Sequence, residues 1–225
     1  MRSPYLCHLA SDYRGAFPDG GMLAERKWDG FRCLFFRGVD GQPRLWTRNG
    51  MPIEGCDHIL RQLLRVEQRA GFPAFIDGEL VVDGTLAATK RWVETDYRQG
   101  GERGTFHAFD MLSQADWKAG GTDTPLYQRK SALAQAVSEA EADRSDWDWT
   151  PGTRGRDESE PSPVELVEDA WVSSHADLIA EARRIWAIGG EGLMAKFAEE
   201  PYRRVRSGAW VKIKRDNMNK WSKAA

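Results

Sequence analysis

The sequence predicts an α+β fold in which mostly antiparallel sheets are flanked by helices. Short apolar or alternating runs outnumber helical segments, and the turn-forming pairs Asp29-Gly30 and Asp40-Gly41 separate successive runs. The regular strand–helix–strand alternation of a dinucleotide-binding fold is missing. With 225 residues, 41% of them hydrophobic and 29% charged, the chain has the size and composition of one globular domain. We therefore expect a single domain over residues 1–225.

Runs of five to nine mostly apolar residues predict the strands. Such runs, bounded by Gly, Pro, Asn or Asp, are typical of strands in antiparallel sheets. In chain order they read GMLAERK, FRCLFF, RLWTR, AFIDGELVV, TFHAFDML, VELVEDAWV, GLMAKF and AWVKIK.

Three segments have the apolar spacing of amphipathic helices. The first is predicted over Asp57–Arg69, and the second over Tyr127–Ala142, which follows a proline. The third begins after a capping box of the form S-x-x-D, from Ser174 to Asp177, and ends at a pair of glycines, residues 189–190. These helices would flank the sheets.

Charge is unevenly distributed along a chain whose formal net charge is only −2. Residues 141–169 contain ten Asp and Glu against three Arg, and they include TPGTRGRDESEPSP, which has no periodicity and predicts a flexible loop at 143–162. Residues 201–225 contain eight Lys and Arg against one Asp, interleaved with aromatic residues. A basic end of this kind is typical either of a solvated surface or of a surface for a phosphate-bearing partner.

Several classes of protein are excluded or disfavoured. No apolar run is long enough to span a membrane, and the first residues lack the apolar core of a signal peptide, so we expect an intracellular, cytoplasmic protein. The three cysteines are odd in number and widely spaced, which fits a reducing compartment and no disulfide framework. The glycine-rich phosphate-binding motifs of P-loop and dinucleotide-binding proteins are absent, so a nucleotide would have to be held in another way.

Lys27 is the first candidate for chemistry. It ends a predicted strand in ERKWDGFRC and is followed by a glycine turn and by a second cation, Arg32. A lysine nucleophile has to lose its proton, and both desolvation and nearby positive charge favour the neutral amine. Taken alone, the pattern equally fits a surface hairpin with an ordinary solvated lysine.

Further charged and aromatic residues stand at the ends of predicted strands. Alternation places Lys212 and Lys214 on one face of a strand, where two cations would be useful opposite a phosphate. Glu79 lies between a glycine and an apolar residue, and Glu191 lies between two glycines at the start of a predicted strand. Both could supply oxygen ligands to Mg²⁺. The alternatives are solvated turns for the carboxylates and a strand with one wet face for the lysines.

Taken in order, these segments resemble the motifs of a known family. KWDG, TRNG, DGEL, FHAFD, EGLMAK and WVKIK resemble the successive motifs of ATP-dependent DNA ligases, within the covalent nucleotidyltransferases. The segments PLYQRKSAL and PYRRVRSGAWVKIK resemble two further stretches of such ligases. The resemblance covers Glu25 to Arg215 and implies an ATP-grasp-like nucleotidyltransferase (adenylation) domain.

The resemblance implies a role for each matched residue. Lys27 would attack the α-phosphate of ATP, release pyrophosphate and form a lysyl-AMP phosphoramidate. Glu25 would lie near the adenine edge, through its backbone or its side chain, and Phe109 and Met194 would lie on the faces of adenine. Glu79 would bind the ribose or a metal, and Lys212 and Lys214 would bind the α-phosphate. Arg32 and Arg48 would contact the nucleotide or the 5′-phosphate of a nick. Glu79 and Glu191 would hold Mg²⁺.

The resemblance also implies the substrate and the later steps. AMP would pass to the 5′-phosphate of nicked duplex DNA, and the 3′-hydroxyl would displace AMP and seal the nick, as required in DNA replication and repair. The residues expected to contact DNA are Arg48, Arg203, Arg204, Arg206 and Arg215. We expect the protein to be a monomer.

The sequence departs from the family after its last motif. Such ligases usually continue into an oligonucleotide-binding barrel, whereas here only 11 residues follow Lys214. We therefore expect no C-terminal barrel and a minimal ligase, or a chain whose missing domain is supplied by a partner protein. Two other interpretations stay open: an RNA ligase or capping-type nucleotidyltransferase, and a non-catalytic module that binds nicks.

Overall fold

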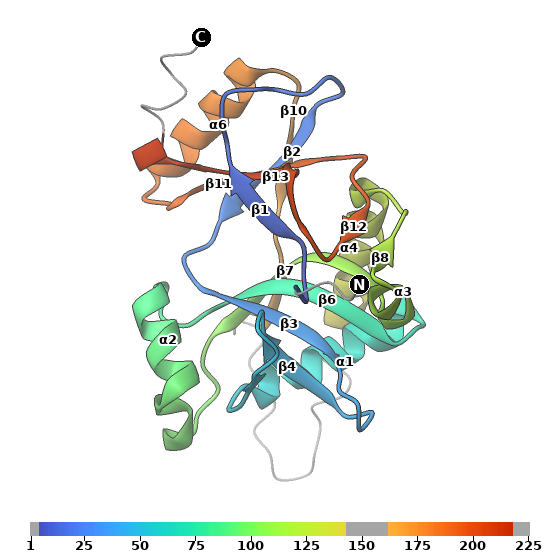
Figure 1. Ribbon diagram of the computed structural model, residues 1–225. Coiled ribbons are helices and arrows are strands. Elements are labelled where there is room, and N and C mark those ends of the chain that lie inside the picture. Colours follow the sequence, from blue (N-terminus) through green and yellow to red (C-terminus); the bar gives the residue numbers. More distant parts are fainter. Residues whose placement is uncertain (1–4, 143–161, 218–225) are drawn as a thin grey trace. The chain divides into compact units, whose positions relative to one another are not determined.

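The computed structural model describes residues 5–142 and 162–217, which form two compact units (Figure 1). Unit 1 comprises Met1–Asp29, Asp116–Gln128 and Val167–Ala225, and unit 2 comprises Gly30–Ala115 and Arg129–Leu166. The single domain expected over residues 1–225 stays a prediction. The loop expected at 143–162 lies, apart from its last residue, outside the described residues.

Unit 1 is built on a five-stranded sheet with the strand order β1-β13-β11-β2-β10. The β1–β13 pair is parallel, and the other neighbours are antiparallel. The strands are β1 (Leu9–Asp12), β2 (Met22–Lys27), β10 (Asp169–Val172), β11 (Gly192–Phe197) and β13 (Arg206–Lys214). The unit also holds the short antiparallel pair β8 (Gly121–Thr122) and β12 (Tyr202–Arg203) and the 3₁₀ turn η2 (Arg215–Asn217).

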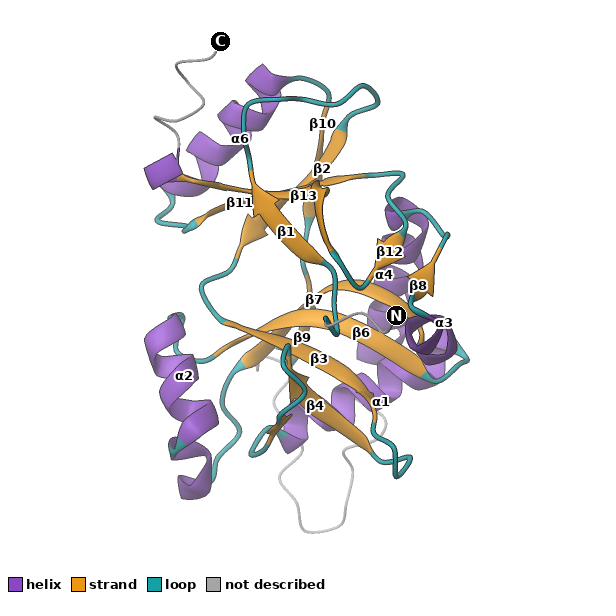
Figure 2. Cartoon of the chain, viewed as in Figure 1, coloured by secondary structure: helices purple, strands orange, loops and turns teal. Residues whose placement is uncertain are grey.

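Helix α6 (His175–Ala187) covers one face of this sheet (Figure 2). Its buried residues Leu178, Ala182 and Ile185 pack with the residues of β2, β11 and β13 whose side chains point to that face, among them Leu193 and Ile213. Because side chains alternate along a strand, the intervening residues of the same three strands point to the opposite face. That second face carries the charged residues considered below.

Unit 2 is built on a six-stranded sheet with the order β5-β4-β3-β6-β7-β9, antiparallel except for the parallel pair β7–β9. Its strands are β3 (Phe31–Arg37), β4 (Pro43–Thr47), β5 (Pro52–Ile53), β6 (Ala74–Val81), β7 (Thr105–Ser113) and β9 (Val164–Leu166). Its helical segments are α1 (Asp57–Ala70), α2 (Leu86–Glu94) and the 3₁₀ turn η1 (Asp96–Gln99). Helices α3 (Gln114–Ala119) and α4 (Leu126–Ala142) contain the boundaries between the units.

The core of unit 2 joins its sheet to α1 and α4. Ile59, Leu63 and Val66 repeat at helical spacing on the buried side of α1, and Leu133 and Ala136 do the same on α4. Helix α1 ends at Gly71, whose backbone has φ 77°, a left-handed conformation that glycine adopts without the steric cost of a Cβ.

The α+β class with mostly antiparallel sheet is confirmed, and the strands of the described residues form open sheets rather than a closed barrel. The three predicted helices are present with ends shifted by one or two residues. No helix among the described residues is long and apolar enough to cross a membrane. Two kinds of detail were wrong: several elements, among them β1 and α3, were not predicted, and one run was assigned to a single strand. Helix α2 was not predicted, although Thr85 caps it by accepting a hydrogen bond from the backbone N–H of Ala88.

The second error concerns the run VELVEDAWV, which was predicted as one strand. It forms two strands that belong to different sheets, β9 in unit 2 and β10 in unit 1. The run contains no glycine or proline that would mark a break between two strands, so its pattern predicts a single strand.

Candidate functional site

The charged face of the unit 1 sheet carries three cross-strand rows of side chains. Strand pairing places Lys27, Gly192 and Lys214 in one row. The next rows along the strands are Glu25, Met194 and Lys212, and then Leu23, Lys196 and Trp210. Directly paired residues point to the same side of a sheet, so the predicted residues of β2, β11 and β13 lie on one surface. The expectation from alternation that Lys212 and Lys214 share a face is met.

Glu191, which immediately precedes β11, contacts two lysines of the first row. Its carboxylate accepts hydrogen bonds from the ammonium groups of Lys27 and Lys214, and the Lys214 Nζ–Glu191 Oε1 distance is 2.5 Å. Burial acts to raise the pKa of Glu191, but the hydrogen bonds from Lys214 and Lys27 outweigh it and hold the pKa below its ordinary value. Glu191 is therefore a carboxylate that bridges two lysines.

This arrangement differs from the surroundings that the sequence suggested for Lys27. Nearby positive charge was expected to favour the neutral amine, whereas the Nζ of Lys27 contacts the carboxylate of Glu191. The lysines of this face also contact a second acid of the same unit, since Lys212 Nζ lies 3.3 Å from Asp12 Oδ1 on β1. Without a bound anion, paired charges on a partly buried surface are more stable than a cluster of like charges.

Glu25 has a buried partner. Its carboxylate Oε2 lies 2.6 Å from Nζ of Lys196, and each of the two side chains is only 2% exposed. The Lys196 ammonium also lies 4.3 Å from the ring centroid of Trp210, and the other side of this tryptophan stacks on His8 with the centroids 4.5 Å apart. The prediction that Glu25 lies near the adenine edge stays a prediction; its side chain takes part in an ion pair.

A second group of predicted residues lies in unit 2, around Arg32 on β3. The guanidinium of Arg32 donates two parallel hydrogen bonds to Asp77 on β6, both 2.6 Å long, and lies 4.6 Å from the ring centroid of Phe109 on β7. A β-bulge at Asp77 and Gly78 shifts the pairing of β6 with β7 and leaves Phe109 as the extra residue. The two parallel hydrogen bonds to Asp77 form a fork that fixes the Arg32 guanidinium beside the ring of Phe109.

Glu79 and Arg48 occupy different positions in unit 2. Glu79 is paired with Arg32 on one side and with His107 on the other, and His107 Nδ1 lies 3.4 Å from Glu165 of β9. Arg48 is exposed in the turn between β4 and β5. The structure thus brings Arg32, Glu79 and Phe109 together on neighbouring strands, and places Arg48 in a turn at the end of β4.

Sequence reasoning missed the partners of these residues. Asp77 stands in the quoted DGEL motif, Lys196 ends EGLMAK, and Asp12 precedes all the motifs. Asp77 and Lys196 could have been found as charged residues within otherwise apolar strands, since such residues are seldom buried without a partner. Nothing in the local sequence marks Asp12.

Four of the five arginines expected to contact DNA, all except Arg48, have contacts within unit 1. Arg203 pairs with Asp123, Arg204 lies over the ring of Trp117, and Arg206 donates to the carbonyl oxygen of Ala10. Arg215 donates to the carbonyl oxygen of Trp186. Arg206 and Arg215 remain exposed at the surface. A role in DNA binding stays a prediction for all four.

The described residues hold no group of three or more His, Cys, Asp and Glu side chains arranged to bind a metal ion. Mg²⁺ is usually held by one or two carboxylates together with water and the phosphate oxygens of a substrate. A single carboxylate such as Glu191, beside lysines that suit a phosphate, fits that kind of site.

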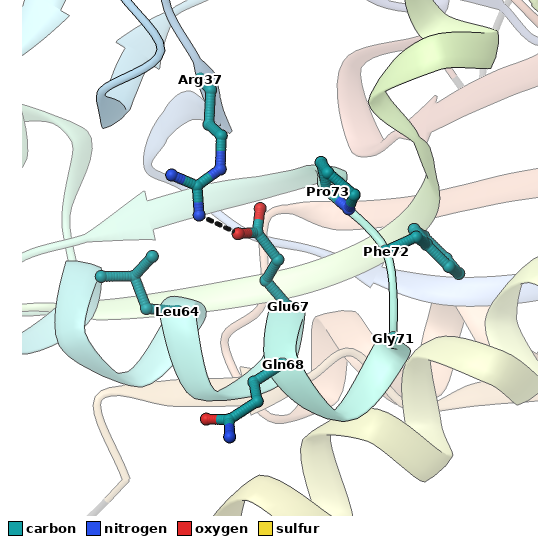
Figure 3. Close-up of a pocket in the computed structure, with 7 residues that line it drawn as sticks. All are labelled: Arg37, Leu64, Glu67, Gln68, Gly71, Phe72 and Pro73. Carbon is teal, nitrogen blue, oxygen red and sulfur yellow. Dashed lines mark hydrogen bonds and ion pairs between the residues drawn. The ribbon is translucent and has the colours of Figure 1, made fainter.

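A cavity of about 410 Å³ opens in unit 2 between the end of β3 and the end of α1 (Figure 3). Arg37 and Glu67, which form an ion pair, line it together with Phe72 and Pro73. None of the predicted site residues lines this cavity.

Comparison with known proteins shows a family match over most of the chain. Residues 4–214 match the family model described as ATP dependent DNA ligase domain. The chain is 31% identical over 144 residues to DNA ligase C of Mycobacterium tuberculosis, an alignment that covers 60% of this chain and 38% of that protein.

Solved structures agree in fold. The chain resembles Pmar-Lig_Pre with a TM-score of 0.76 and 19% identity, over 94% of this chain and 47% of that one. It resembles the chlorella virus DNA ligase-adenylate with a TM-score of 0.66 and 17% identity, over 92% of this chain and 68% of that one. The chain therefore spans about half the length of Pmar-Lig_Pre and less of DNA ligase C.

Proposed function

We propose, from the premise that the chain belongs to the family of ATP-dependent DNA ligase domains, that it reacts with ATP through Lys27. The Nζ of Lys27 would attack the α-phosphorus of ATP. An N–P bond forms, the bond to the bridging oxygen of pyrophosphate breaks, and a proton leaves the amine for solvent. The observation that carries this proposal is that Lys27, Lys212, Lys214 and Glu191 share one face of the unit 1 sheet.

The lysines of this face would neutralise the phosphates. Reaction at phosphorus depends on placing the reactants in line and on balancing the charge of the phosphate oxygens, more than on acid–base groups. Lys212 and Lys214 are each about one-third exposed, so an incoming phosphate can reach them. A phosphate oxygen is an alternative partner to the carboxylates of Asp12 and Glu191.

Mg²⁺ bound to the triphosphate would supply further charge neutralisation, and Glu191 is the carboxylate of the lysine face that we propose to hold it. The assignment of Glu79 to Mg²⁺ stays a prediction. The residues of unit 2 keep the nucleotide roles that the resemblance implies. We assign Phe109 to stacking on adenine, Glu79 also to the ribose, and Arg32 and Arg48 to the nucleotide or to a 5′-phosphate. The rigid fork between Arg32 and Asp77 supports a positioning role for Arg32. Met194, in the row between Glu25 and Lys212, would pack on the base.

The later steps would seal a nick in duplex DNA. AMP passes from Lys27 to the 5′-phosphate of the nick, and the 3′-hydroxyl then attacks that phosphorus, forms the phosphodiester bond and releases AMP. DNA rather than RNA is supported by the family match and by the relatives named above. The partner protein, the monomeric state and the intracellular location expected from the sequence stay predictions.

Covalent labelling tests the first step. With α-³²P-labelled ATP and Mg²⁺, the wild-type protein should form an acid-labile adduct that survives denaturing electrophoresis, and Lys27→Ala should form none. Lys90→Ala is a matched control, because Lys90 is an exposed lysine paired with Glu94 on α2. Equal labelling of the wild type and Lys27→Ala would show that another residue is the nucleophile.

Sealing assays test the substrate. We expect nicked duplex DNA to be sealed with ATP in preference to RNA ends and to GTP. Preference for RNA ends would favour an RNA ligase, and preference for GTP a capping-type enzyme. Binding to nicks without sealing, even of pre-adenylated DNA, would indicate a non-catalytic module.

A further inference from the structure

The buried ion pair between Lys196 and Glu25 has no role in the chemistry proposed above. Its two charges are removed from water, at 2% exposure for each side chain, and are 2.6 Å apart. Burying such a pair often contributes little to stability compared with apolar residues of the same size. Its presence beside the candidate nucleotide site therefore calls for another explanation.

Glu25 lies close to the lysines that we assign to phosphate. It precedes Lys27 by two residues on the same face of β2, which corresponds to about 7 Å along the strand. It also shares a cross-strand row with Lys212, with Met194 between them. A Glu25 carboxylate without a partner would be attracted to both lysines.

Lys196 approaches Glu25 from the neighbouring row. Its backbone is paired with Leu23, and its side chain extends to the carboxylate of Glu25 while its ammonium rests on the ring of Trp210. Trp210 is itself fully buried and stacked on His8. These contacts leave the Lys196 side chain little freedom, so it can hold the carboxylate in one place.

We propose that Lys196 is a positioning residue that holds the negative charge of Glu25 away from Lys27 and Lys212 and so keeps these lysines available to phosphate. Apart from the pair of Lys196 and Glu25, the face holds Lys27, Lys212 and Lys214, which meet two carboxylates and leave one positive charge in excess. An unpaired Glu25 would cancel that excess. The inference rests on the proposed function for the identity of the phosphate compound, but the charge balance itself can be measured without ATP.

Binding of inorganic tripolyphosphate measures the charge balance, because this anion has phosphates but no base or ribose. We compare its affinity by calorimetry in the wild type, Lys196→Met, Glu25→Gln and the double variant. Lys196→Met should weaken binding about tenfold, since two unit charges about 7 Å apart interact appreciably in a partly buried setting. Adding Glu25→Gln should restore wild-type affinity within about twofold, because the released charge is then gone.

Two further measurements separate this role from a structural one. Glu25→Gln alone should bind tripolyphosphate at least as tightly as the wild type, a result that stands even where Lys196→Met does not fold. Lys90→Met, which removes one partner of an exposed ion pair on α2, should leave the affinity unchanged. Thermal melting shows which variants are folded.

The inference would be overturned by a double variant that binds as weakly as Lys196→Met, or by Glu25→Gln binding more weakly than the wild type. It would also be overturned if the wild type did not bind tripolyphosphate. Failure of the proposed function has a different signature. In that case the wild type binds tripolyphosphate with the expected pattern across the variants and yet forms no adduct with ATP.

Discussion

Two ion pairs at the unit 2 sheet and the ion pairs on the charged face of the unit 1 sheet use different cations. In unit 2, Arg129 and Arg32 each grip an aspartate through two parallel hydrogen bonds, with the Arg129–Asp110 contacts at 2.7 and 2.8 Å. In unit 1, the charged face of the sheet uses lysines, each placed on a carboxylate by its single ammonium group. A guanidinium fork fixes the orientation of both partners, whereas an ammonium is a point charge on a flexible stem.

The difference suggests a division of labour within the chain. Arg129 and Asp110 are almost completely buried, so their fork acts as part of the scaffold of unit 2. Lys27, Lys212 and Lys214 are 21–37% exposed, and in the proposed function phosphate oxygens replace their carboxylate partners. The proposed chemistry requires both kinds of pair. Lysine pairs suit the partly exposed face of unit 1, where a phosphate would replace the carboxylate. Arginine forks suit the positions in unit 2 where the ion pair stays intact.

The largest expected effect is on stability, through the buried ion pair of Arg129 and Asp110 in unit 2. Arg129→Met leaves the carboxylate of Asp110 buried without its cation and should lower the free energy of unfolding by about 3–5 kcal/mol. Denaturant unfolding followed by fluorescence measures this free energy. Arg129→Lys keeps the charge but loses the fork, and we expect it to recover only part of the loss.

The matched control for that prediction is Arg91→Met on α2. Arg91 is 71% exposed and pairs with Asp96 at 3.3 Å, so its loss should change the free energy of unfolding by no more than about 0.5 kcal/mol. Similar losses for Arg91→Met and Arg129→Met would contradict a special role for the buried fork.

A smaller effect is expected when a fork is introduced into unit 1. Lys214→Arg keeps the positive charge but can grip Glu191 through two hydrogen bonds, so the carboxylate should give way less readily to phosphate. We expect the rate of adduct formation with labelled ATP to fall about tenfold, with unfolding changed by less than about 0.5 kcal/mol. Lys90→Arg serves as the control. An undiminished rate would show that the type of cation at position 214 does not matter.

The smallest expected effect is on the pKa of Asp40, whose carboxylate accepts two hydrogen bonds from Arg44 at the surface of unit 2. Hydrogen bonds from the side chain of Arg44, and then from the backbone N–H of Gln42, lower the pKa of Asp40 to about 2 from the ordinary 3.8. Because the folded pKa is the lower one, the stabilisation is present above about pH 4 and is lost as the pH falls through about 2. Arg44→Ala should return the pKa towards 3.8 in a carboxyl-carbon NMR titration, and an unchanged titration would contradict the fork.

Much of the fold could be predicted from local patterns. The periodic apolar residues of α1, α4 and α6 marked these helices, and Ser174 accepts a hydrogen bond from the backbone N–H of Asp177 as the capping box predicted. The carboxylate of Asp177, however, accepts from Ser173 rather than from Ser174. The change of sheet within VELVEDAWV could not be predicted, because pairing partners are chosen by distant strands.

The sequence by itself determined which residues of a strand share a face, because the alternation of side chains is a local property of the backbone. It therefore put Lys212 beside Lys214 and ordered the ligase motifs along the chain. Only the tertiary structure decided which charges meet. Glu191 bridges Lys27 and Lys214, and Lys196 holds Glu25. These contacts form because β2, β11 and β13 pair in one register, although more than 160 residues separate β2 from β11 in the sequence. A shift of one residue in that register would turn every one of these side chains to the other face.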